Sequence, residues 1–184
     1  MAQHYIRVPF EDGVELELRA GDQVFLTGTI FTARDAAHKR MVEQLEKGEA
    51  LPIDLTNQAI YYVGPTPAKP GAVIGSAGPT TSSRMDKYTP RLLQEGLKGM
   101  IGKGYRSKKV IDSIAENNAV YFAAIGGSGA LLAQKIKSSE LIAYEDLGTE
   151  AIRKIEVENF PCIVVNDHKG GDWYKESQAN FKQS

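Results

Sequence analysis

Cysteine is nearly absent from this sequence, since Cys162 is the only one among 184 residues. A single cysteine excludes an internal disulfide and leaves no cysteine cluster for a metal ion. The three histidines are scattered along the chain, without the spacing of metal ligands. We therefore expect no metal site built by this chain itself.

Long apolar runs and an excess of either charge are missing as well. The first residues, MAQHYIR, lack the apolar core of a signal peptide, and no run approaches membrane-spanning length. The formal net charge is −1, so no overall field attracts the chain to nucleic acid or to an anionic membrane. We expect a cytoplasmic protein without a nucleic-acid or membrane partner, in which any basic function is local.

The composition that remains is that of one globular domain over residues 1–184. Hydrophobic residues make up 42% and charged residues 24%, which is enough apolar material for a sizeable core. Strand and helix patterns alternate through the middle, and both ends are rich in strands. This order predicts the α/β class, with a mixed layered sheet and flanking helices. Residues 1–20 are expected to form a strand arm, and residues 173–184 a polar tail.

Individual elements follow from the periodicity of apolar residues. In the arm, alternation over 5–19 with a turn at 12–13 predicts an edge hairpin or a docking arm. The later predicted strands are 23–31, 59–64, 72–74, 97–102, 119–125, 141–144, 155–157 and 162–165. Helices are predicted after Asp35, over 85–96, after an N-cap at Ser107, and from Gly129 through Ile136. Pro90 either begins the second helix or kinks a longer one.

A glycine-rich turn, GGSG at 126–129, is the one sign of a nucleotide loop. It has neither the full G-x-G-x-x-G spacing nor the lysine of a P-loop. We therefore interpret it as a tight strand-to-helix turn, whose N–H groups still suit a small anion.

The segment GSAGPTTSSR at 75–84 carries five hydroxyl side chains and ends in Arg84. Glycine permits close approach of the backbone to a ligand, and arginine offers a planar fork that matches carboxylate or phosphate. Composition alone fits a mobile polar turn equally well. An anion cradle is favoured because the segment follows a predicted buried strand at 59–64, and sites are often built on loops of rigid scaffolds.

Arg34 breaks a local rule, because a cation at the start of a helix opposes the macrodipole. Either the side chain simply points into water, or it binds an anion together with the free N–H groups of the helix. Arg34, Thr80, Arg84 and Lys103 each follow a predicted strand or a glycine-rich turn. Together they suggest a pocket for a substrate with more than one carboxylate.

Several motifs around these residues resemble one known family. The motifs are TARDAAH at 32–38, YVGP at 62–65, GPTTSSRMD at 78–86, GKG at 102–104, IGG at 125–127 and KIEVENFP at 154–161. They look like the β subunit, or C-terminal domain, of class I fumarate hydratases and L(+)-tartrate dehydratases. The resemblance extends from about Gly21 to Asp167, and the GPTT-x-x-RMD run is its most specific part.

The resemblance implies a swivelling β/β/α domain and a hydro-lyase, which reversibly adds water across the double bond of a four-carbon dicarboxylate. The family uses a four-iron, four-sulfur cluster held by three cysteines of the α subunit or N-terminal domain. With Cys162 alone this chain cannot hold such a cluster, so it is expected to need a cysteine-bearing α subunit, in an assembly such as α2β2. Alone it is expected to be inactive.

By the same resemblance, Arg34 and Arg84 would clamp substrate carboxylates and Lys103 would hold a carboxylate oxygen. Thr80 would hydrogen-bond the substrate and take part in proton transfer, so Thr80 and Lys103 are the candidate catalytic residues. The general base is expected on the partner chain.

Three alternatives stay open at this point. Hydration of fumarate to L-malate is the leading reaction, while L(+)-tartrate or mesaconate chemistry would use the same residues. A non-catalytic module that binds a dicarboxylate or phosphate would use the same pocket, and a scaffold domain would leave Arg34 unexplained.

Overall fold

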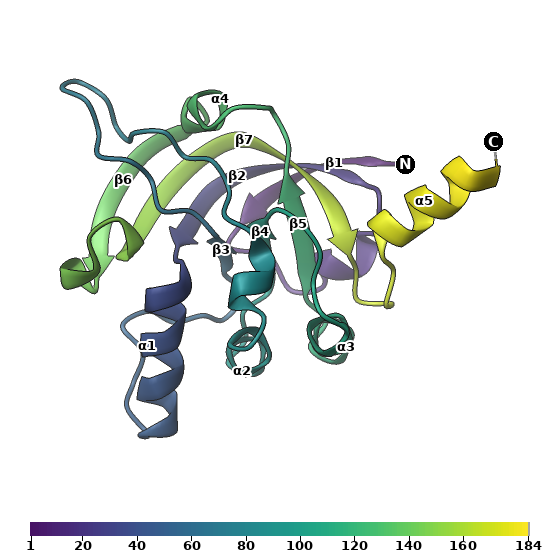
Figure 1. The fold of residues 1–184 in the computed structure, drawn as a ribbon, viewed down its shortest axis with the longest axis horizontal. Coiled ribbons are helices and arrows are strands. Elements are labelled where there is room, and N and C mark those ends of the chain that lie inside the picture. Colours follow the sequence, from purple (N-terminus) through teal and green to yellow (C-terminus); the bar gives the residue numbers. More distant parts are fainter. Residues whose placement is uncertain (184) are drawn as a thin grey trace.

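The computed structural model describes residues 1–183 as a strongly twisted sheet of seven strands, with helices around it (Figure 1). The strand order is β1-β2-β3-β4-β5-β7-β6, and β2 also pairs with β7. The strands are β1 (Gln3–Val8), β2 (Gln23–Thr32), β3 (Ala59–Tyr61), β4 (Gly99–Gly102), β5 (Val120–Ala124), β6 (Ile136–Ala143) and β7 (Ile152–Asn166).

The additional pairing closes the sheet into a barrel of β2, β3, β4, β5 and β7. Strands β2 to β5 run parallel to one another, whereas β7 runs antiparallel to both β2 and β5. The predicted mixed sheet with flanking helices is thus confirmed, but the sheet is closed rather than an open layer. Strands β1 and β6 extend it outside the barrel.

Closure depends on the length of β7, which the sequence pattern divided into two strands. Its 15 residues form one curved strand, and positive φ at Asn159 (49°) accompanies the bend between the two predicted halves. Pro161 lies within this strand opposite Phe25, and its carbonyl accepts from the Ile125 N–H. The break that proline and asparagine suggested is therefore a bend.

The helices are α1 (Asp35–Glu46), α2 (Thr89–Gln94), α3 (Lys108–Glu116), α4 (Gly129–Ala133) and α5 (Trp173–Gln183). Figure 1 shows α1, α2 and α3 together on one side of the sheet. The predicted cap at Ser107 is confirmed, since its side chain accepts from the Val110 N–H. Pro90 lies in the first turn of α2, so it begins a helix rather than kinking one. No helix within residues 1–183 has the length and apolar character needed to cross a bilayer.

The core has two parts, one inside the barrel and one beneath the helices. Tyr61 packs in the first and Tyr62 in the second, because successive side chains of an extended chain point to opposite faces. Phe122 and Phe160 fill the barrel, while Met41 of α1 packs outside it. The backbone at the end of β3 is therefore held by packing on both of its faces.

Three local predictions are wrong. Residues 5–19 form no hairpin, because β1 pairs parallel with β2 and residues 14–17 form a 3-10 turn that buries Leu18. Residues 72–74 are irregular, with Val73 exposed. The helix predicted to run through Ile136 ends at Ala133. The tail, for which the sequence predicted polarity but no conformation, forms the helix α5.

Candidate active site

Three neighbouring parallel strands, β2, β3 and β4, end at the same edge of the barrel. Arg34 follows β2, Tyr62 to Gly64 follow β3, and Lys103 follows β4 directly. Ligands of α/β sheets bind beyond the carboxyl ends of parallel strands. This edge therefore gathers three segments that are distant in sequence.

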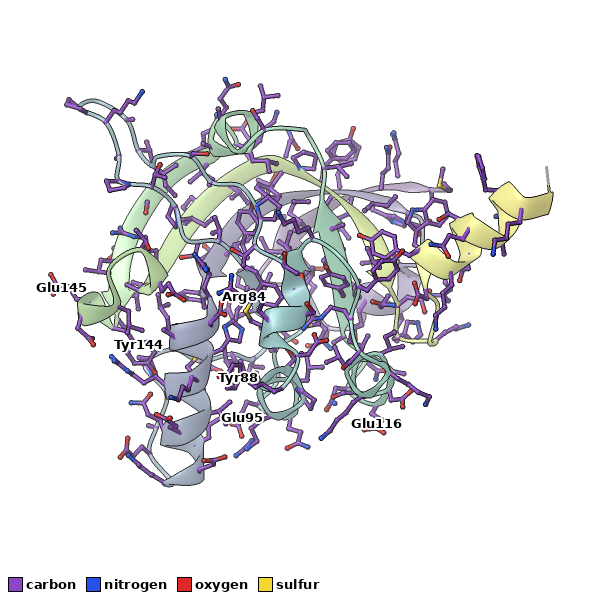
Figure 2. All side chains as sticks on the ribbon, in the orientation of Figure 1. Arg84, Tyr88, Glu95, Glu116, Tyr144 and Glu145 are labelled. Carbon is purple, nitrogen blue, oxygen red and sulfur yellow. The ribbon has the colours of Figure 1, made fainter. Side chains whose placement is uncertain are left out.

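The two arginines of the predicted clamp lie on either side of Asp35, the first residue of α1. Arg84 Nε donates to Asp35 Oδ2 at 2.8 Å, and Arg34 Nε lies 3.8 Å from Asp35 Oδ1. Figure 2 shows Arg84 beside the N-terminal end of α1. The Arg34 side chain is 23% exposed and that of Arg84 52% exposed, so neither is buried.

Gly64, which has no side chain, leaves space for the side chain of Arg34. A Cβ at Gly64 would lie 2.8 Å from Arg34 Cδ and 2.9 Å from Nη1, so only glycine leaves room for the guanidinium at this distance. A second carboxylate, Glu150, lies 4.0 Å from Arg34 Nε and accepts from the Ala36 N–H at 3.2 Å. Arg34 therefore lies against the backbone that leaves β3, not free in water.

His38, one turn into α1, holds the backbone of Arg34. Its Nδ1–H donates to the Arg34 carbonyl at 2.7 Å, and its ring lies edge-on to Tyr62 at 5.3 Å. Burial away from water, together with the nearby Arg106 charge, lowers the pKa of His38 to about 4 despite the bond to Arg34. The imidazole is therefore neutral at pH 7, with Nε2 buried and unpaired among residues 1–183.

Thr80 is joined to the strand ends by backbone bonds. The Thr80 N–H donates to the Tyr62 carbonyl at 2.7 Å, and the Ser82 N–H donates to the Lys103 carbonyl at 2.9 Å. Thr81 and Lys103 form an isolated parallel bridge. Residues 80–82 thus lie across the ends of β3 and β4, which brings Thr80 and Lys103 to the same edge as the arginines.

Close packing fixes this crossing. A Cβ at Gly102 would lie 2.0 Å from Ser82 Oγ, and Ser82 is fully buried with its hydroxyl bonded to the Tyr121 hydroxyl at 2.7 Å. The N-terminal part of segment 75–84 is held as well, because the Ala77 N–H donates to the Gly129 carbonyl at 3.1 Å. The glycine-rich turn at 126–129 therefore packs against this segment, which agrees with its interpretation as a tight turn.

A buried arginine that sequence reasoning missed anchors the far end of the segment. The Arg106 side chain is fully buried and donates to Asp86 Oδ1 at 2.7 Å and to Thr89 Oγ1 at 2.8 Å. Its guanidinium also lies over the Tyr62 and Tyr121 rings, at 5.2 and 4.7 Å. Asp86 belongs to the RMD motif, which was the only signal in the sequence that pointed to this pair.

The four predicted site residues are therefore gathered at one edge of the barrel. Within residues 1–183, no hydrogen bond or ion pair takes the Lys103 amine, the Thr80 hydroxyl or the terminal nitrogens of Arg34 and Arg84. These groups remain able to bind a ligand. A cleft of ≈ 360 Å³ lies between residues 65–74 and β6, and none of the four residues lines it.

The part of the chain that the structure describes offers no site for an iron–sulfur cluster or another metal ion. Cys162 lies fully buried in β7, and burial raises the pKa of its thiol, so it stays protonated. Among residues 1–183 no group of three histidine, cysteine or acidic side chains could hold a metal ion.

Fold and site geometry together define a small α/β barrel domain that presents three cations at the ends of parallel strands. The family model described as "Fumarase C-terminus" matches residues 11–177, so the chain belongs to this family. It is homologous to the C-terminal region of class I fumarate hydratases and to tartrate dehydratase β subunits.

Relatives of two lengths carry this assignment. The chain is 44% identical over 155 residues to "Fumarate hydratase class I, aerobic" of Escherichia coli (strain K12), covering 83% of this chain but 28% of that protein. It is 42% identical over 161 residues to "Fumarate hydratase 2" of Leishmania major, again covering 28% of the relative. By contrast, it covers 85% of "Putative L(+)-tartrate dehydratase subunit beta" of Methanocaldococcus jannaschii, at 39% identity over 166 residues.

Proposed function

We propose that this chain is the β-type subunit of an iron–sulfur hydro-lyase that interconverts fumarate and L-malate. The observation that carries the proposal is the grouping of Arg34, Arg84, Lys103 and Thr80 at one strand edge, inside a fumarase-family domain. The barrel with its helices grouped on one side is also in keeping with a swivelling β/β/α domain.

The two arginines would bind the carboxylates of the substrate. A guanidinium forms two parallel hydrogen bonds to a carboxylate, and two such groups on opposite sides of Asp35 suit a short dicarboxylate. Lys103, exposed and unpaired among the described residues, would hold one carboxylate oxygen as a point charge. Binding of both carboxylates would fix the position of the double bond between them.

Thr80 would hydrogen-bond the substrate and take part in proton transfer. Hydration adds a hydroxyl to one alkene carbon and a proton to the other, so a donor near the second carbon is required. A free threonine hydroxyl is a poor acid at neutral pH. Thr80 would therefore act with a group of the partner chain, which would also supply the general base.

The cluster would belong to that partner. No group of side chains among residues 1–183 fits one, and the chain spans about 28% of the length of the fumarate hydratases that it matches. The remainder of such an enzyme would come from a separate cysteine-bearing α subunit, as the subunit name of the Methanocaldococcus relative suggests.

The experiment is co-expression with the cysteine-bearing subunit, anaerobic purification, and an assay of fumarate hydration. We expect activity in the pair and none in this chain alone. Fumarate hydration by the isolated, metal-free chain would refute the two-subunit proposal.

L(+)-tartrate dehydration is the second candidate, favoured by the relative whose length this chain nearly matches. An assay of the same pair on L-tartrate separates the two reactions. If the pair does not form and this chain alone binds dicarboxylates, it is a binding module instead.

A further inference from the structure

The carboxylate of Asp35 has contacts that helix stability does not explain. An acidic residue in the first turn of a helix usually interacts with free backbone N–H groups. In α1 the Ala36 N–H donates instead to Glu150 Oε1, at 3.2 Å, and the N-cap position has no side-chain bond. The Asp35 carboxylate is left to the two arginines.

Both arginines face Asp35 with the same part of the guanidinium. Arg84 Nε donates to Oδ2 at 2.8 Å, and Arg34 Nε lies 3.8 Å from Oδ1, just beyond hydrogen-bond range. Arg34 Nε and Asp35 Oδ1 are both buried and without a hydrogen-bond partner in the described chain. No terminal nitrogen of either arginine donates to Asp35, and these nitrogens have no hydrogen-bond partner within residues 1–183.

We propose that Asp35 is a positioning residue, which holds Arg84 by a hydrogen bond from Nε and attracts Arg34 as an ion pair, and so leaves their terminal nitrogens for a dicarboxylate. The choice of ligand rests on the proposed function, whereas the positioning itself does not. Asp35 also places a negative charge between two cations that would otherwise repel each other.

A competing effect has the opposite sign, because Asp35 also repels an anionic ligand. Two observations make positioning the larger effect. The Arg84 side chain is half exposed, and its bond to Asp35 is the only hydrogen bond that holds it within residues 1–183. Without that bond a long side chain regains rotamer freedom that binding must remove again. The Asp35 side chain is 31% exposed, so solvent and salt weaken its repulsion of an anion.

The first test is NMR of the arginine Nε–H groups in this chain alone. We expect Asp35→Ala to speed exchange of the Arg84 Nε–H with solvent at least tenfold, and Asp35→Asn, which keeps an acceptor, to have a smaller effect in the same direction. Asp146→Ala is the matched control, because it removes an arginine–carboxylate pair, with Arg40, that lies outside the site. It should leave the Arg84 signal unchanged. An Arg84 signal that does not respond to Asp35→Ala would overturn the proposal.

The second test is kinetic, in the complex with the cysteine-bearing subunit. Asp35→Asn should raise KM for fumarate about tenfold with kcat within about threefold, because the lost interaction serves binding. A lower KM would mean that repulsion dominates and would refute positioning. If the wild-type pair acts on neither fumarate nor L-tartrate, the proposed function fails, and the NMR result still decides the role of Asp35.

Discussion

His38 makes the stability of this domain depend on pH in a direction that the structure fixes. Its pKa is about 4 when folded, because it is buried, and about 6.5 in an unfolded chain. Between these values the unfolded chain binds a proton that the folded chain does not, so unfolding becomes easier as the pH falls. From about pH 7.5 to about pH 5, linkage predicts a loss of about 2 kcal/mol in unfolding free energy from this one group.

The assay is urea unfolding at both pH values, followed by the fluorescence of Trp173, the single tryptophan. Other groups also titrate, so the prediction concerns the difference between proteins. His38→Phe keeps a ring beside Tyr62 and should lose about 2 kcal/mol less than the wild type over this range.

Cys162→Ala is the control for His38→Phe. It also changes a fully buried side chain, but the Cys162 thiol stays protonated throughout this range, so the cost should be equal at both pH values. Equal pH dependence in wild type and His38→Phe would refute the assignment of a buried, neutral imidazole.

Three further predictions concern how the site is held. Gly102→Ala should lower the unfolding free energy by about 1–3 kcal/mol, because its Cβ would meet Ser82 Oγ, and adding Ser82→Ala should restore part of the loss in a thermal melt. Arg106→Met should cost about 3–5 kcal/mol by urea titration, since it leaves Asp86 without its ion pair; a loss below about 1 kcal/mol would contradict a structural role. Arg84→Lys should lower kcat/KM for fumarate at least tenfold in the reconstituted pair, about 1.4 kcal/mol, while a neutral result would make Arg84 structural.

Local chemistry accounts for the parts of the fold that the sequence predicts well. The Ser107 cap, the start of α2 at Pro90 and the helical face of α1 all depend on residues within one or two turns. Closure of the barrel does not, because β2 pairs with β7 more than a hundred residues later. No periodicity within either strand reports that pairing.

The candidate site likewise contains residues that local sequence predicts and contacts that only the folded chain creates. Arg34, Thr80, Arg84 and Lys103 are predicted from motifs that lie next to strand ends, and the structure gathers them at one edge. Arg84 contacts Asp35 from 49 residues away and Arg106 contacts Asp86 from 20 residues away, so neither pairing can be derived from neighbours in sequence. Arginine usually lies at the protein surface, so the residue type alone would not predict that Arg106 is buried.

The closed barrel also bears on how the domain is built into different proteins. Every strand of the barrel has a hydrogen-bonded neighbour on both sides, so its integrity does not depend on pairing with a strand from another domain. Only β1 and β6 have a free edge among the described strands. Such a domain suits either arrangement, as part of a longer chain or as a separate chain. The relatives include both a long single chain and a separate short one.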